Sequence, residues 1–185
     1  MAEITLRDVQ AVDVHAHPYV ANEQPYTSQN FIRRLSLSVL PEQMHSGRVS
    51  SPLQPYPGSI MWMQILIRRL ARYFACEPTL AEVVRQRNER AGDFQAYTRE
   101  LFADAKITGV VADFGYPTPM LDRQAYAELC NARIWEVYRI EPVMVRLRKE
   151  AESFAAFAEL YRADLRNALQ RADVVGLKSI IAYRS

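Results

Sequence analysis

The sequence predicts an α/β fold in which parallel strands alternate with helices. Short apolar runs of strand length occur at 10–16, 107–114, 133–140 and 174–183. Between them lie stretches with apolar residues at three- and four-residue steps, the period of amphipathic helices. Strands that alternate with helices form parallel sheets, because a parallel pair needs a long crossover connection.

Composition excludes several classes of protein. The 185 residues are 49% hydrophobic and 24% charged, which fits a globular domain with a sizeable core. A net charge of +2 gives no strong field toward nucleic acid or an anionic membrane, and the longest apolar stretch is too short to span a bilayer. We expect a cytoplasmic protein, because no signal peptide pattern is visible and two cysteines make no disulfide framework.

The first strand ends in the motif V-D-V-H-A-H-P of residues 12–18. Side chains alternate along a strand, so Asp13, His15 and His17 share one face. Residues two apart on a strand have α-carbons about 6.6 Å apart, and two imidazoles at that span can converge on one ion. Imidazole is also a common zinc ligand. The alternative remains that the pattern arose by chance and that each histidine is simply hydrogen-bonded.

The stretch 19–106 is expected to form a helical insertion after the first strand. Prolines punctuate its beginning, and apolar residues at helical steps over 63–74 predict a helix. Thr79 with Glu82 forms a capping-box pattern, and Asp93 can cap a further helix. Such an insertion is expected to act as a lid or specificity element over the site.

The second half of the chain repeats strand and helix units. The strand at 107–114 is followed by a short helix at 122–131, a strand at 133–140, a helix capped by Ser153 and a last strand at 174–183. No helix follows that strand. Four units without a closing helix indicate half of an eight-stranded barrel, so we expect a truncated chain.

Three stretches resemble the amidohydrolase superfamily, in its amidohydrolase-related (amidohydrolase 2) branch. They are residues 12–18, 103–116 and 176–185, and only the first is diagnostic of the superfamily. The chain is most similar to the amidohydrolase-type domain associated with glutamine synthetase-like proteins. The resemblance implies the N-terminal half of a metal-dependent (β/α)8 TIM barrel over 1–185, carrying strands 1–4, with 19–106 as the insertion.

The resemblance also implies a metal site. His15 and His17 would be ligands of a divalent metal, expected to be zinc, as one or two ions. Lys178 lies where some branches place a further ligand, and in some relatives that lysine is carbamylated. The alternative is that Lys178 pairs with an inward carboxylate such as Asp113 or Glu141, because a buried ammonium needs a partner.

The catalytic residues are unknown at this stage, since the general base of the family is expected in the missing C-terminal half. Three weaker candidates would orient the ligands or contact substrate. Asp13 shares the face of the histidines, Asp113 ends the second strand, and Arg184 follows the fourth and could meet an anionic group.

The leading hypothesis is a metal-dependent hydrolase that acts on a C–N or amide bond of a small polar substrate, incomplete as given. A divalent metal would polarise the scissile carbonyl and lower the pKa of its water. Two alternatives stay open. One is a decarboxylase or other lyase of the same branch, and the other is a non-catalytic fragment. The expected partner is a small-molecule substrate, with a homo-oligomer or a complementing barrel half as further options.

Overall fold

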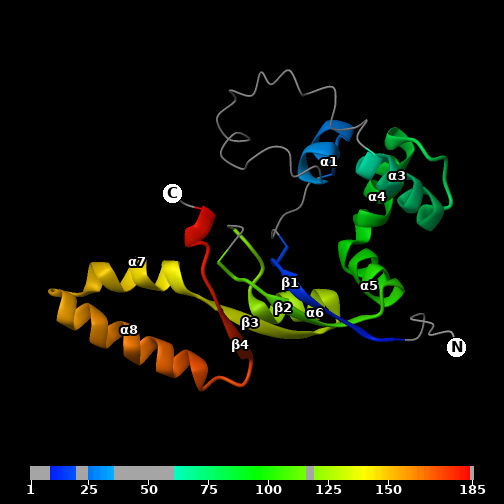
Figure 1. Cartoon of the computed structure of the whole chain (residues 1–185). Helices are drawn as coiled ribbons and strands as arrows, with labels where there is room; N and C mark the ends of the chain where they lie inside the picture. Colours follow the sequence, from blue (N-terminus) through cyan, green and yellow to red (C-terminus); the bar gives the residue numbers. More distant parts are fainter. Residues whose placement is uncertain (1–8, 20–24, 36–60, 116–118, 184–185) are drawn as a thin grey trace, which may run out of the picture. The chain divides into compact units, whose positions relative to one another are not determined.

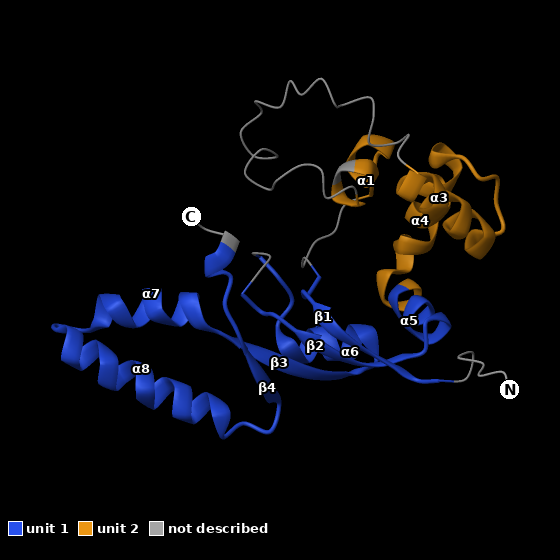
Figure 2. Cartoon of the chain, viewed as in Figure 1, with its two compact units in different colours: residues 1–23, 98–185 blue, residues 24–97 orange. Residues whose placement is uncertain are grey.

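The computed structural model describes residues 9–19, 25–35, 61–115 and 119–183. The chain divides into two compact units, and the boundary falls inside α5 (Figure 2). Unit 1 comprises residues 1–23 and 98–185, and unit 2 comprises residues 24–97. Unit 2 falls within the range expected to form the helical insertion, and its role as a lid stays a prediction.

Unit 1 is built on a parallel sheet of four strands in the order β1-β2-β3-β4 (Figure 1). The strands are β1 (Ala11–Ala16), β2 (Ile107–Ala112), β3 (Arg133–Arg139) and β4 (Val174–Lys178). The predicted alternation of strands and helices is therefore confirmed, although β4 is shorter than expected and is followed by the short helix η3 (Ile181–Tyr183).

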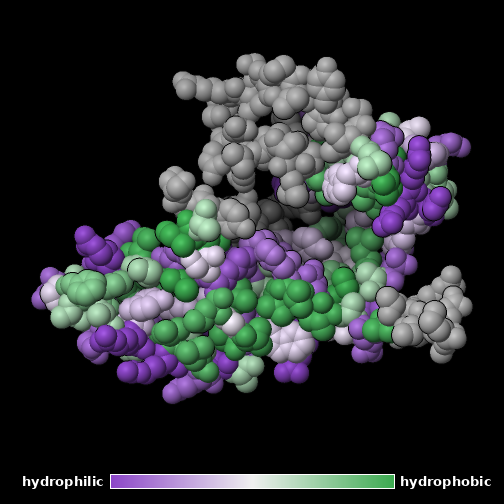
Figure 3. All heavy atoms as spheres, in the orientation of Figure 1, coloured by the Kyte–Doolittle hydropathy of each residue, from purple (hydrophilic) through white to green (hydrophobic). Residues whose placement is uncertain are grey.

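The predicted N-terminal half of a (β/α)8 TIM barrel is wrong. Unit 1 is a small α/β domain on an open four-stranded sheet, and its connections depart from the one helix per strand of that barrel. Two helices, α7 (Ile140–Glu150) and α8 (Phe154–Leu169), separate β3 from β4. Both edge strands expose apolar side chains, namely Val12 and Val14 on β1 and Val175 and Leu177 on β4. Figure 3 shows a hydrophobic band across unit 1.

One face of β2 and β3 is covered by α6 (Arg123–Cys130) (Figure 1). The helix begins where the Asp122 carboxylate accepts a hydrogen bond of 2.8 Å from the backbone N–H of Ala125. The buried side chains between this helix and the sheet form the main apolar core of unit 1, which we call the α6 cluster. Its members are Val110, Ala112, Tyr126, Cys130 and Ile134.

The opposite face of the sheet carries the next residues in the alternation. On that face the indole of Trp135 lies directly over Gly109, where a Cβ atom would collide with the ring. Gly109 therefore allows β2 and the Trp135 side chain to approach closely.

The helices α7 and α8 pack against each other (Figure 1). The predicted cap of α8 is confirmed, because the Ser153 hydroxyl accepts a hydrogen bond of 3.1 Å from the backbone N–H of Ala156. The helix α7 was not predicted. Pro142 lies in its first turn, where a missing backbone N–H costs no intrahelical hydrogen bond.

Unit 2 is helical in its described part and contains α1 (Ser28–Leu35), α3 (Met61–Phe74), α4 (Leu80–Arg90), η2 (Ala91–Asp93) and the first residues of α5 (Phe94–Asp104). Two expected caps are confirmed: Thr79 accepts from the backbone N–H of Glu82 at 3.3 Å, and Asp93 accepts from that of Ala96 at 2.9 Å. Its buried apolar side chains include Phe31, Met63, Ile67, Phe74, Val83 and Tyr97.

Across the described ranges of both units, none of the helices has the length and hydrophobicity that crossing a membrane requires.

Candidate active site

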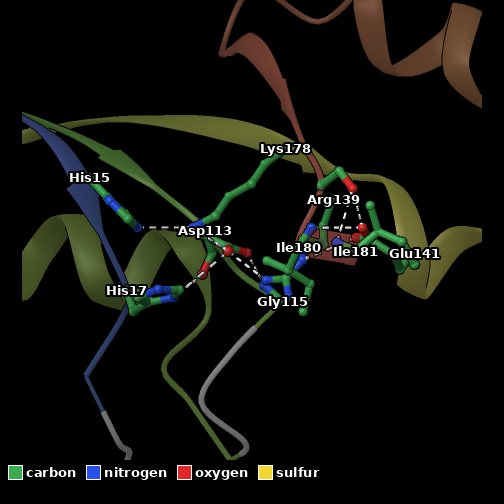
Figure 4. Close-up of polar contacts among 10 residues, drawn as sticks. His15, His17, Asp113, Gly115, Arg139, Glu141, Lys178, Ile180 and Ile181 are labelled. Carbon is green, nitrogen blue, oxygen red and sulfur yellow. Dashed lines mark hydrogen bonds and ion pairs between the residues drawn. The ribbon is translucent and has the colours of Figure 1, made fainter. Parts of the chain in front are cut away.

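Charged and imidazole side chains gather where the four strands end (Figure 4). The carboxyl ends of parallel strands lie at one edge of a sheet, which is where α/β folds place their sites. Each strand contributes to this group, which we call the charged cluster. Its members are His15 and His17 from the end of β1, Asp113 directly after β2, Arg139 at the end of β3 and Lys178 at the end of β4.

Asp113 is the centre of the charged cluster. Its side chain is 1% exposed, and one carboxylate oxygen, Oδ2, lies 2.5 Å from Arg139 Nη1 and 2.9 Å from Lys178 Nζ. The other oxygen, Oδ1, accepts a hydrogen bond of 2.8 Å from the backbone N–H of Gly115. A buried carboxylate is tolerated only with partners of this kind, so the two cations and the amide stabilise its charge.

The pKa of Asp113 is set by opposing effects. Burial alone would raise it, but the hydrogen bonds from Lys178 and Gly115 and the charge of Arg139 outweigh burial and hold the pKa below its ordinary value. Asp113 is therefore a carboxylate at neutral pH, and it balances part of the positive charge of its two neighbours.

The two histidines lie together, with ring centroids 5.8 Å apart. His17 Nδ1 lies 3.2 Å from the backbone carbonyl oxygen of Asp113, which can only accept, so Nδ1 carries the proton. Lys178 Nζ donates to His15 Nε2 over 3.0 Å, because an ammonium group can only donate. Hydrogen bonds to residues at the ends of β2 and β4 therefore orient both rings.

The other predicted site residues have different contacts. Asp13 accepts a hydrogen bond of 3.0 Å from the backbone N–H of His15, so it supports the strand end and not the imidazole. Arg184 lies outside the described residues. Of the two carboxylates expected as partners of Lys178, Asp113 is the one that pairs with it.

Glu141 forms a separate contact beside the charged cluster. One carboxylate oxygen accepts from the Ser179 hydroxyl at 2.5 Å and from the backbone N–H of Ile180 at 2.7 Å. The Ser179 hydrogen bond is the main cause that lowers the pKa of Glu141 to about 2, with smaller contributions from the Ile180 N–H and the Arg139 charge. Glu141 thus ties α7 to the segment after β4.

Arg139 is the cluster member that the sequence analysis missed. It is 11% exposed, and its guanidinium contacts Asp113 and lies 3.5 Å from Glu141. A signal was available, because Arg139 ends its strand just as Lys178 ends the next one. The register places these two residues side by side.

The charged cluster does not close around a metal ion in this arrangement. In the described ranges, no group of three or more His, Cys, Asp or Glu side chains is placed to hold one. Catalytic zinc normally has three protein ligands. In addition, the Lys178 ammonium already contacts Nε2 of His15, one of the two predicted ligands. The two imidazoles fit a metal chemically, but the group around them does not.

A cavity of about 400 Å³ in unit 1 lies beside the cluster and is formed by β3, α7 and α8. Its lining includes Gly115 and Arg139 but neither histidine nor Lys178. The cavity therefore does not contain the imidazole pair.

Comparison with known proteins finds a match in fold to a solved structure. No family model and no curated protein matches the chain. A crystal structure from Lactobacillus casei ATCC 334, provisionally named a metal-dependent hydrolase, matches with a TM-score of 0.72 and 18% sequence identity.

The match covers 97% of this chain and 44% of that one, so this chain spans less than half the length of its structural neighbour. At this identity the likeness establishes the fold alone. The link to hydrolases is accordingly coarse: the chain shares its fold with a protein that carries such a name.

Proposed function

We propose that this chain provides part of the active site of a metal-dependent hydrolase, with His15 and His17 as two ligands of a divalent metal. The observation that carries the proposal is the pair of imidazoles at the end of β1, whose centroids are 5.8 Å apart (Figure 4). Their position at the carboxyl end of a parallel strand is typical of α/β enzyme sites. The name of the structural neighbour supports the coarse class of hydrolase.

The hydrogen bond of the His17 ring supports the same assignment. His17 donates from Nδ1 to a backbone carbonyl, a contact that metal-binding histidines commonly make with their second nitrogen. This tautomer places the lone pair of His17 on Nε2, whereas Nε2 of His15 accepts from Lys178 in this structure.

The finer parts of the proposal come from the sequence resemblance. We assign zinc as the metal and a C–N or amide bond of a small polar substrate as the bond cleaved. The remaining ligands and the general base are not assigned to residues of this chain. Arg139 and Asp113 hold the cluster together and are assigned no reaction step.

Metal content tests the proposal. The purified chain is loaded with Zn²⁺, desalted and analysed for bound metal beside His15→Ala, His17→Ala and the double variant. We expect bound zinc in the parent and loss of most of it in each variant. The matched control is His45→Ala, which removes the remaining histidine of the chain. Unchanged zinc in the double variant would exclude the two histidines as ligands.

A second measurement tests the reaction class. The loaded chain is assayed against small amides and amino-group-bearing acids, with ammonia and carbon dioxide measured in the same reactions. Hydrolysis of a C–N bond releases ammonia or an amine, and we expect this product to depend on His15 and His17. Release of carbon dioxide alone would replace the hydrolase assignment with a decarboxylase.

A further inference from the structure

An apolar groove lies at the free end of the hairpin formed by α7 and α8. Figure 1 shows the two helices running together away from the sheet and turning at residues 151–153. The groove has a volume of about 650 Å³ and lies wholly within unit 1. Met144 and Val145 line it from α7, and Phe154 and Phe157 line it from α8. We call this site the hairpin groove.

The fold of the hairpin does not explain why these side chains are exposed. Phe154 is the first residue of α8 and is 83% exposed. The helix is capped by the Ser153 hydroxyl, so its start does not depend on the Phe154 ring. Met144 and Val145 are 41% and 60% exposed on the facing helix. A group of large apolar side chains exposed together marks a surface that another molecule covers.

The aromatic side of the hairpin groove is already ordered. The Phe157 ring centroid lies 6.2 Å from that of Phe154 and 6.1 Å from that of Tyr161, against which it is stacked. Rings held in a row lose little conformational freedom when a partner covers them, which lowers the entropic cost of association. The groove therefore has the rigid aromatic anchor that is typical of the centre of a protein interface.

The rim of the hairpin groove carries one charge of each sign. Arg148 and Glu152 both line the groove and are exposed. Neither has an ion pair or a side-chain hydrogen bond with the residues that the structure describes, whereas the nearby Arg146 is paired with Glu150 and Asp164. A partner with charge of a single sign would satisfy one rim residue and repel the other. A second copy related by a twofold axis satisfies both, because residue contacts across such an axis are reciprocal.

We propose that two copies of this chain associate through the hairpin groove, with α7 and α8 of both copies packed around a twofold axis. The two Phe154 side chains form the apolar centre of the contact, and Arg148 of each copy pairs with Glu152 of the other. A stable interface buries about 800 Å² on each partner, and one aromatic side chain supplies about 150–250 Å² of such area. The proposal is independent of the hydrolase assignment, because no member of the charged cluster lines the groove.

The first experiment measures association of the full chain by sedimentation equilibrium over a range of concentrations. We expect the parent to be a dimer that dissociates on dilution, and Phe154→Asp to weaken the dimer about tenfold or more, as for loss of a central aromatic anchor. The matched control is Leu169→Asp, at an apolar position that is 55% exposed at the other end of α8, and it should associate like the parent. Circular dichroism checks the fold of each variant, and Phe154→Ala serves if Phe154→Asp does not fold.

A second experiment tests whether the partner is a twofold-related copy. Arg148→Glu and Glu152→Arg should each weaken the dimer several-fold, because each places like charges opposite one another. The double variant should recover the parent affinity, and an equimolar mixture of the two single variants should form a mixed dimer that is tighter than either variant alone. Lys149→Glu reverses the charge of an exposed α7 residue that does not line the groove, and it should associate like the parent.

Three results would overturn the proposal. A parent that is monomeric at every concentration would show that no second copy covers the groove. A dimer that Phe154→Asp and Phe154→Ala leave intact would place the contact on another surface. Weakening by both charge reversals, without recovery in the double variant or in the mixture, would show that the contact is not reciprocal.

Discussion

The α6 cluster and the charged cluster share strands β2 and β3 and depend on different forces. The alternation of side chains places Val110, Ala112 and Ile134 on one face and Asp113 and Arg139 on the other. The α6 cluster is held by burial of apolar surface, which has no preferred direction. The charged cluster is held by directional contacts to one carboxylate.

This difference determines how each cluster fails. A smaller apolar side chain leaves a cavity that its neighbours partly fill, so the loss is graded. Loss of one partner in the charged cluster leaves buried charge uncompensated, so its members fail as a unit. The charged cluster is therefore the more fragile of the two, although Asp113 is its one fully buried member and all five members of the α6 cluster are buried.

The largest effect is expected from Asp113→Ala. The substitution leaves Arg139 and Lys178 without their shared carboxylate, and we expect the free energy of unfolding to fall by about 3–5 kcal/mol. Urea unfolding followed by circular dichroism measures the change. The control is Glu159→Ala, which removes an exposed ion pair with Arg162 on α8 and should cost at most about 1 kcal/mol. Equal losses in the two variants would mean that Asp113 is no more important than a surface carboxylate.

The helices and strands were predicted correctly where they depend on residues close together in the sequence. The caps at Thr79, Asp93 and Ser153 need only the residue and the next three positions, and each forms as its pattern indicates. The error concerned the arrangement of the strands. An open sheet and half of a closed barrel have the same local periodicity and the same order of strands, and they differ in whether the edge strands pair with further strands, which periodicity does not specify.

The candidate site could likewise be predicted only where its contacts arise within one strand. The approach of His15 and His17 follows from the two-residue period of one strand. The sequence leaves Asp113 and Glu141 as two possible partners of Lys178, because the paired side chains come from different strands. Arg139 was missed for the same reason, since the register that places it beside Lys178 is a property of the assembled sheet.

A smaller loss of stability is expected from a substitution in the α6 cluster. Ile134 is 4% exposed in the α6 cluster, and Ile134→Ala should lower the free energy of unfolding by about 2–5 kcal/mol. Ile134→Val removes one methylene and should cost about 0.5–1.5 kcal/mol, which gives the graded response of a packed core. Equal costs for the two variants would contradict this account. The loss should also be independent of pH, because no charge is involved.

An effect smaller than that of Ile134→Ala is expected from Glu141→Gln, and pH separates it from the others. The Ser179 hydroxyl, the Ile180 N–H and the Arg139 charge lower the pKa of Glu141 from an ordinary value of 4.5 to about 2 in the folded state. A lowered folded pKa means that the carboxylate stabilises the fold above about pH 4.5 and loses this contribution as the pH falls toward 2.

Glu141→Gln should therefore cost about 1–2 kcal/mol at pH 7, the size of one hydrogen bond to a charged group. The gap between parent and variant should narrow from pH 5 to pH 3, because the parent carboxylate begins to lose its advantage as protons bind. Urea unfolding at several pH values measures the gap, with Ile134→Ala as the reference whose deficit stays constant. If the difference in free energy of unfolding between the parent and Glu141→Gln also stayed constant with pH, the carboxylate charge would not be the cause of the loss. Glu141 would then stabilise the fold through packing, like the apolar contacts of the α6 cluster.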